Sequence, residues 1–323
     1  MRRLAYLERI LAAYLIKRES HLTFWHGEPL VNQNFEPGKL GEYYMPFIAK
    51  ANYPGQYDDT GIPLLNYHGR VGLQYNPIAI AQYGLGNYNL FVRTGDENRK
   101  VKFLKVADWF VKNLEKTPQG TRVWYHHFDW EYRDNLKAPW HSALAQGQGI
   151  SLLVRAHRET RNDVFLTAAQ DAFHTFEKDV KEGGVTVTDR KGYLWFEEAI
   201  VDPPTHILNG FIWASWGIYD YSMYTGNRHA DQLFNEAIRT LVDNLPEFDA
   251  GFWSLYEQSG TRMKMLASPF YHSLHIAQLE VMHKLTKEPI FKQFADRWNA
   301  YRQNALKRKA ALIYKAIFKI LYY

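Results

Sequence analysis

Residues 77–116 read PIAIAQYGLGNYNLFVRTGDENRKVKFLKVADWFVKNLEK. Their helical pattern predicts one helix over 77–93 and a second over 98–116. The link between them, Thr94-Gly95-Asp96-Glu97, is short, polar and contains a glycine, which is typical of the end of one helix and the start of the next. The stretch therefore predicts a pair of helices joined by a tight turn.

The same arrangement recurs along the chain. Further pairs are expected at 140–158 with 162–182, 205–225 with 228–245, and 271–287 with 288–304. Helix pairs of about 35 to 40 residues, separated by longer loops, are typical of an α/α barrel or toroid. We predict a mainly α fold, an incomplete α/α barrel of paired helices.

The remaining segments complete the expected organisation. Residues 20–75 are rich in Gly, Pro, Asn and Asp, which predicts an arm of loops and short strands. The runs 185–188 and 193–196, with Asp189 to Gly192 between them, predict a small hairpin. We expect three parts: an N-terminal helix (Leu4 to Lys17) with its loop/β arm over 1–60, a catalytic barrel over 61–305, and a tail over 306–323.

The long segments between pairs hold many of the side chains that a site needs. They are residues 117–139, 183–204 and 246–270, and the long loops of such folds gather at one end. We therefore expect the site, with its small hairpins, at that end of the barrel.

Composition narrows the class of protein. The chain has 323 residues, 46% of them hydrophobic and 23% charged, as in ordinary globular proteins. Its 10 Trp, 22 Tyr and 19 Phe indicate a ligand that stacks on rings, such as a sugar or a nucleobase, or else only an aromatic core. The net charge of +5 favours a polyanionic partner. The absence of Cys excludes disulfides and thiolate metal sites and fits a reducing compartment.

The tail is a cationic amphipathic segment. Between Ala305 and Tyr323, apolar residues alternate at helical spacing with lysine and arginine, and no acidic residue occurs. This pattern fits peripheral contact with an anionic membrane surface, or packing on the barrel or on the Leu4 to Lys17 helix. No run is long enough for a spanning helix and no signal peptide is evident, so we expect a cytoplasmic protein, in possible contact with the inner membrane surface.

Common catalytic motifs are absent from the sequence, including phosphate loops, zinc-protease motifs and serine-hydrolase elbows. Three segments instead concentrate polar and aromatic side chains. They are Tyr67 to Pro77 with His68, Arg70, Gln74 and Tyr75; Trp195 to Glu198 followed by His206 and Asn209; and Gly251 to His275. Taken singly, each fits a solvated turn, a helix cap or close helix packing equally well.

Taken together, these runs resemble a known family. The quoted runs are Ile78 to Leu85, Ala143 to Arg155, Trp195-Phe196-Glu197-Glu198, Leu208 to Phe211, Tyr256, Tyr271 to Leu279, and Pro289 to Trp298. In this order they resemble the D-glucuronyl C5-epimerases that act on heparan-type polysaccharide, over about residues 60 to 305. The family's acidic segment has a tyrosine directly after the second glutamate, where this chain has Ala199.

The resemblance implies epimerisation of D-glucuronate to L-iduronate within a heparosan-like polymer. The reaction removes the proton at C5 and returns one from the opposite face. Glu198 and Tyr271 match the family's two proton carriers, and Tyr256 and Arg262 join them in the expected catalytic group. Arg262, Arg70, His272 and His275 are the expected cations for the substrate carboxylate, with Arg262 first.

The other expected contacts are to the sugar. Tyr256 and Trp140 are expected to face it, while Gln148 and Asn209 would hold hydroxyls, with close helix packing as the other interpretation of Gln148. Tyr67, His68, Gln74, Tyr75, Gln146 and Glu197 complete the expected substrate-binding set. No metal and no cofactor are expected, because side chains alone can move the proton.

Other activities remain open from the sequence. A toroidal polysaccharide lyase also abstracts the C5 proton but then expels the O4 substituent, and a glycoside hydrolase would need two acids across a glycosidic bond. A binding protein without catalysis is a further alternative because of Ala199. The expected partners are an anionic polysaccharide and a second copy in a homodimer, with no nucleic acid.

Overall fold

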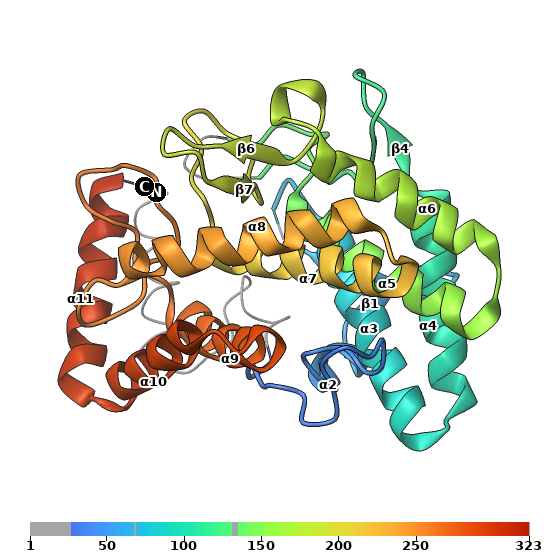
Figure 1. Ribbon diagram of the computed structural model, residues 1–323, viewed down its shortest axis with the longest axis horizontal. Coiled ribbons are helices and arrows are strands. Elements are labelled where there is room, and N and C mark those ends of the chain that lie inside the picture. Colours follow the sequence, from blue (N-terminus) through green and yellow to red (C-terminus); the bar gives the residue numbers. More distant parts are fainter. Residues whose placement is uncertain (1–26, 68, 131–134, 323) are drawn as a thin grey trace.

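The computed structural model describes residues 27–67, 69–130 and 135–322 of the chain, and the Leu4 to Lys17 segment lies outside them. Four helix pairs build the body (Figure 1). They are α3 (Pro77–Thr94) with α4 (Glu97–Lys112), α5 (Ala143–Thr160) with α6 (Asp163–Phe173), α7 (Leu208–Thr225) with α8 (Arg228–Asn244), and α9 (Pro269–Thr286) with α10 (Pro289–Gln303). The predicted pairing is confirmed.

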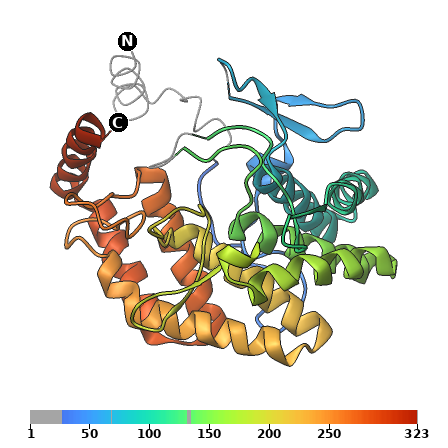
Figure 2. The same ribbon diagram turned by 90° about the horizontal axis from the view of Figure 1, so that it is seen from above.

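The first helix of each pair forms an inner layer. Helices α3, α5, α7 and α9 are buried over most of their turns and contact one another in that order. Helices α4, α6, α8 and α10 cover them from outside and bury only one face. The pairs form an open arc (Figure 2), so the described chain is a mainly α, incomplete α/α barrel.

Local sequence signals set the ends of these helices. Asn76, Ser142 and Ser268 accept hydrogen bonds from first-turn backbone N–H groups of α3, α5 and α9. Gly95 and Gly226 end α3 and α7 in the left-handed conformation, which glycine adopts without strain. The polar links of the sequence are therefore the caps that separate one helix from the next.

Two predicted helices are shorter than expected. The expected helix over 98–116 ends as α4 at Lys112, and Glu115–Lys116 is a strand (β4) paired with β5 (Arg122–Val123). The expected helix over 162–182 ends as α6 at Phe173, and the chain continues in 3₁₀ turns over His174–Glu177 and Val180–Glu182. These turns deliver the backbone to the following hairpin, where Val185 N–H bonds to Thr175 O.

The N-terminal arm has two parts. Helix α2 (Ile48–Ala51) leads to a small sheet of β1 (Gln56–Tyr57), β2 (Pro63–Asn66) and β3 (Leu73–Gln74), which projects from the helical body (Figure 2). Before it, residues 27–47 cross the C-terminal ends of the inner helices, and we call this segment the strap. The predicted arm of loops and short strands is therefore present in the described residues.

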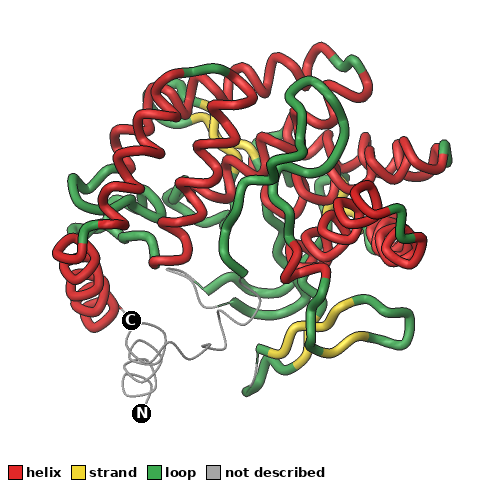
Figure 3. The backbone as a smooth tube through the Cα atoms, turned by 90° about the horizontal axis from the view of Figure 1, so that it is seen from below, coloured by secondary structure: helices red, strands yellow, loops and turns green. Residues whose placement is uncertain are grey.

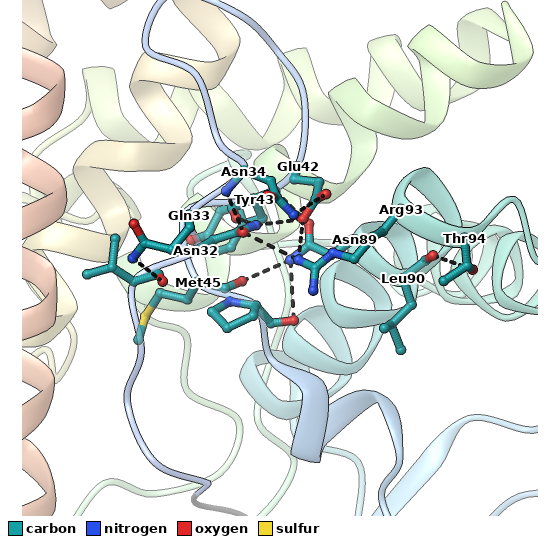
Figure 4. A network of polar contacts seen from close by, with 12 residues as sticks. Asn32, Gln33, Asn34, Glu42, Tyr43, Met45, Asn89, Leu90, Arg93 and Thr94 are labelled. Atoms are coloured by element: carbon teal, nitrogen blue, oxygen red, sulfur yellow. Dashed lines mark hydrogen bonds and ion pairs between the residues drawn. The ribbon is translucent and has the colours of Figure 1, made fainter.

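Buried polar contacts fasten the strap to the helices (Figure 4). On α3, Asn89 accepts from Tyr43 N at 2.6 Å and donates to Met45 O at 2.9 Å, while Arg93 pairs with Glu42 at 2.7 Å. Deeper in, Tyr44 donates to Asp220 of α7 at 2.6 Å. The strap thus closes the end of the barrel opposite the helix N-termini.

The long segments between pairs lie at the other end, where the inner helices begin. The predicted hairpin is confirmed as β6 (Thr186–Thr188) and β7 (Leu194–Phe196), which are antiparallel. Backbone bonds join this region to its neighbours: Ala143 N donates to Glu197 O, Leu208 N to Tyr256 O, and Gln258 N to Thr205 O. Figure 3 shows all loops and turns of the described chain in green, against the helices in red and the strands in yellow.

The tail is helical. Helix α11 (Ala305–Tyr322) follows α10 directly and lies at the edge of the molecule (Figure 1). No helix among the described residues is long and apolar enough to cross a bilayer.

Candidate active site

The site lies where β7 ends and where α7 and α9 begin. Glu198 follows β7 by two residues, Asn209 is in the first turn of α7, and Tyr271 is in the first turn of α9. The loop between α8 and α9 adds Tyr256. The fold therefore brings together predicted residues that are separated by more than seventy positions in the sequence.

Glu198 packs against the first turn of α7. Its Oε2 accepts a hydrogen bond from Asn209 Nδ2 at 3.2 Å. A side chain at Gly210 would overlap the Glu198 carboxylate, so glycine at that position makes room for it. Burial, with a smaller contribution from the charge of Glu197, raises the pKa of Glu198 to about 8 despite the opposing Asn209 bond. Near neutral pH the carboxyl is poised between its acid and base forms.

Tyr271 faces Glu198 from α9. Burial raises the pKa of its phenol, and the negative charge of Glu198 raises it further. A hydrogen bond with Tyr256 opposes this shift. The rings of Tyr256 and Tyr271 meet edge to face, with centroids 4.9 Å apart. The arrangement places a carboxyl and a phenol close enough for the charge of one to alter the pKa of the other.

A wall of aromatic rings continues from this pair. Tyr67, just after β2, packs against Phe128 with ring centroids 4.8 Å apart and against Trp130 at 5.5 Å. Asn76 Nδ2 donates to the Tyr67 hydroxyl at 2.6 Å, and Tyr67 itself contributes to the raised pKa of Tyr271. Tyr67 therefore lies close enough to Tyr271 to belong to the same site.

Glu197 is bound to His206 in the turn before α7. It is 1% exposed, and its Oε1 lies 2.5 Å from His206 Nδ1, while its Oε2 accepts from His206 N at 3.2 Å. His206 in turn stacks on Trp195 with centroids 4.4 Å apart. Because both carboxylate oxygens are bound to His206, Glu197 fixes the turn before α7. This role differs from the substrate contact expected from the sequence.

Ala199 fills an apolar position. It is buried with Leu136 and Ile207, next to Trp130, Trp140 and Tyr256. The position that carries a phenol in the family pattern is therefore part of a small packed cluster in this chain.

Three other predicted contacts are occupied by structural bonds. Gln146 is fully buried and bonds to Trp124 N and Arg122 O. Gln148 is also fully buried and accepts from Gln82 at 3.2 Å, which fits the helix-packing interpretation. Trp140 stacks on His126 with ring planes 3° apart, but remains half-buried beside the Ala199 cluster.

His272 and His275 do not provide cations to this site. Both rings are fully buried and bind Ser254 Oγ, at 2.8 and 3.0 Å, and His272 Nε2 also binds Trp298 O. Burial lowers the pKa of His272 to about 4 and also lowers the pKa of His275. Neutral, hydrogen-bonded rings fasten α9 to α10 and to the preceding loop, so the expected role as carboxylate-binding cations is not supported.

The remaining predicted residues lie on surface segments. Arg70 and Arg262 are exposed and make no hydrogen bond or ion pair with another residue of the described chain. Tyr75 points to the arm, where its hydroxyl donates to Asp58 at 2.7 Å, and Gln74 donates to Val71 O. His68 lies outside the described residues. Both arginines stay predictions as substrate contacts.

Sequence reasoning missed two contributors. Gly210 makes space for Glu198, and Gln278 donates to Asn209 O at 2.9 Å, which fixes α9 against the first turn of α7. Gln278 is two helical turns after Tyr271, so helical spacing alone could have placed it on the same face. Within the described ranges, no group of three or more His, Asp or Glu side chains is placed to hold a metal ion.

Residues 119–300 match the family described as D-glucuronyl C5-epimerase C-terminus. A D-glucuronyl C5-epimerase of Caenorhabditis elegans is 30% identical over 220 residues, covering 64% of this chain and 35% of the relative. An uncharacterized protein of Methanocaldococcus jannaschii is 31% identical over 266 residues, covering 76% of this chain and 84% of the relative. The chain thus spans about a third of the length of the C. elegans relative.

An unsaturated glucuronyl hydrolase from Bacillus sp. GL1 superposes with a TM-score of 0.47 at 14% identity, over 69% of this chain and 60% of that one. A family 105 glycoside hydrolase of C. acetobutylicum superposes with a TM-score of 0.47 at 13% identity, over 71% and 63%.

The family match covers more than half of the chain, and it includes Glu198, Asn209, Tyr256 and Tyr271. The chain belongs to the D-glucuronyl C5-epimerase family.

Proposed function

We propose that the chain inverts C5 of D-glucuronate residues within a heparosan-like polysaccharide, giving L-iduronate. The observation that carries the proposal is the Glu198–Tyr271 pair, a carboxyl with a pKa of about 8 next to a phenol whose pKa responds to the carboxyl's charge. The family match supports the same chemistry.

In the proposed mechanism the Glu198 carboxylate takes the C5 proton, and the Tyr271 hydroxyl delivers one to the opposite face. A free carboxylate is a weak base, and burial strengthens it by raising its pKa. When Glu198 accepts the proton its charge disappears, and so does the contribution by which that charge raises the pKa of Tyr271. Tyr271 therefore becomes a stronger acid at the moment when it must donate.

Other side chains assist in this proposal. The hydrogen bond from Tyr256 stabilises the phenolate that Tyr271 leaves, and proton exchange with solvent restores both groups. The negative charge that develops on the substrate carboxylate needs a cation or donors. Arg262 and Arg70 are the proposed cations, since both guanidinium groups are exposed and without a partner in the described chain. No cofactor takes part in these steps.

The direct test is incubation with heparosan in deuterated water, followed by NMR for deuterium at C5 and for iduronate. Wild-type protein is expected to introduce deuterium into an intact polymer. Glu198→Gln and Tyr271→Phe should each abolish exchange while the fold remains, as monitored by circular dichroism. Full exchange in either variant would remove that residue from the mechanism.

Matched controls lie at the opposite end of the barrel. Glu159→Gln alters a carboxyl that accepts from Tyr88, and Tyr224→Phe removes a hydroxyl that binds His157. Both changes resemble the site substitutions chemically but lie near the C-terminal ends of α5 and α7. Exchange should persist in both.

The same incubation separates the alternative reactions. A lyase would create an unsaturated uronate end that absorbs ultraviolet light and shortens the polymer, whereas an epimerase leaves the chain length unchanged. A polysaccharide-binding protein would retain heparosan without introducing deuterium, and the Ala199 position would then be the first to examine.

A further inference from the structure

Helix α11 presents an apolar stripe away from the protein. Leu306, Ile313, Ile317 and Leu321 are 78%, 61%, 46% and 64% exposed. Their spacings of seven, four and four residues place them along one side of the helix. Solvent-exposed apolar residues that are contiguous, and not scattered, indicate a contact surface.

The other side of α11 is fixed to the body, so the stripe has a defined direction. Ala311 and Phe318 are buried, and the Tyr314 ring lies 6.2 Å from that of Phe252. Lys315 Nζ donates to Leu266 O at 2.7 Å, and Lys307 lies over the Tyr301 ring. The helix is thus held at the edge of the molecule with its stripe outward.

The charge around the stripe is positive. Lys309 is exposed beside it, whereas Arg308 is exposed on another side of the helix, where it donates to Arg302 O at 3.0 Å. The sequence from Ala305 to Tyr323 contains no acidic residue. Amphipathic helices with apolar and basic side chains lie in the interface of anionic membranes, where apolar insertion and attraction to lipid headgroups act together. We propose that α11 docks the protein on the surface of an anionic lipid membrane through this stripe.

Charge favours a membrane over a second copy of the chain. An α11–α11 contact would bring together two helices that carry basic and no acidic residues, and like charges across an interface oppose association. Anionic headgroups instead provide the opposite charge over a wide area. The four stripe residues are not among those of the Glu198–Tyr271 site, so docking and C5 exchange can be measured in separate assays.

The test is co-sedimentation of the full chain with vesicles of phosphatidylcholine alone and of phosphatidylcholine mixed with phosphatidylglycerol. Wild type should bind the mixed vesicles and bind them more weakly in about 1 M than in about 0.1 M salt, because salt screens the headgroup charge. Ile313→Ser with Ile317→Ser should weaken binding about tenfold or more, since two inserting side chains are lost. Arg308→Gln with Lys309→Gln should weaken it by about fivefold per charge, on anionic vesicles only.

The matched control is Val92→Ser with Val101→Ser, which alters two valines that are 44% and 51% exposed on α3 and α4. These changes should leave sedimentation as in wild type, and C5 exchange on a soluble polymer should be unchanged in all three variants. Absence of binding to anionic vesicles by wild type would overturn the proposal, as would equal loss in the valine variant. A dimer that the Ile313 and Ile317 changes dissociate, without vesicle binding, would assign the stripe to self-association and overturn it too.

Discussion

Replacing Asn209 by alanine tests the electrostatic account of the site. Asn209 Nδ2 donates to Glu198 Oε2 at 3.2 Å, and this bond favours the ionised carboxyl and lowers its pKa. Without the bond, the pKa of Glu198 should be higher. The pH at which C5 exchange reaches half of its maximum should therefore move upward.

The size of the shift follows from the bond. A hydrogen bond to a charged group contributes roughly 1.5 to 3 kcal/mol, and the 3.2 Å length favours the low end. At 1.36 kcal/mol per pH unit, the midpoint should rise by about one unit. In the wild type, a pKa of about 8 predicts that exchange rises about fiftyfold between about pH 6 and about pH 8.

The assay is the initial rate of deuterium incorporation at C5 of heparosan, followed across pH for wild type and Asn209→Ala. The matched control is Asn244→Ala, which removes a buried amide that donates to Thr240 O near the end of α8. Its midpoint should equal that of wild type. A wild-type exchange rate that no longer changes above about pH 5 would refute the raised pKa of Glu198. If Asn209→Ala lowers the rate but leaves the midpoint pH unchanged, Asn209 contributes packing and does not alter the pKa of Glu198.

Three further predictions concern stability. From its ordinary pKa of 4.5 up to about 8, the Glu198 carboxyl is protonated in the folded chain but ionised in the unfolded one, so stability falls as pH rises through this window. Glu198→Gln should therefore raise the free energy of unfolding near neutral pH by up to about 3 kcal/mol; equal urea midpoints at about pH 7 would contradict this. The Arg155 guanidinium is 1% exposed and pairs with Asp220 at 2.6 Å, so Asp220→Asn leaves it buried without a counter-charge. The free energy of unfolding in urea should fall by about 3 to 5 kcal/mol, and a fall of less than about 1 kcal/mol would contradict the buried pair. Gly147→Ala would place a Cβ atom 2.6 Å from Ala214 Cα and push α5 away from α7. The free energy of unfolding should fall by about 1 to 3 kcal/mol, and an unchanged Tm would show that the two helices adjust to the added methyl group without loss of stability.

The helices were predictable because their signals are local. Apolar spacing, capping residues such as Asn76 and Ser142, and the glycine at position 95 act within a few residues. Where the local signal was ambiguous, prediction extended too far, as in 162–182, where α6 ends at Phe173 and the following 3₁₀ turns bond to the start of the hairpin, as in the bond from Val185 N to Thr175 O. Bonds of this kind leave no periodic pattern in the sequence.

Residue spacing alone predicts the helix pairs and the cationic amphipathic tail, and the family resemblance points to Glu198 and Tyr271 as candidate proton carriers. Which partner each neighbouring polar side chain contacts became visible only in the folded chain. Folding separated Glu198, beside Asn209, from Glu197, bound to His206, and it buried His272 as a neutral ring against Ser254. The physical reason is that the pKa of a side chain depends on its burial and on charges brought close by folding, and neither quantity is encoded by residue type or spacing.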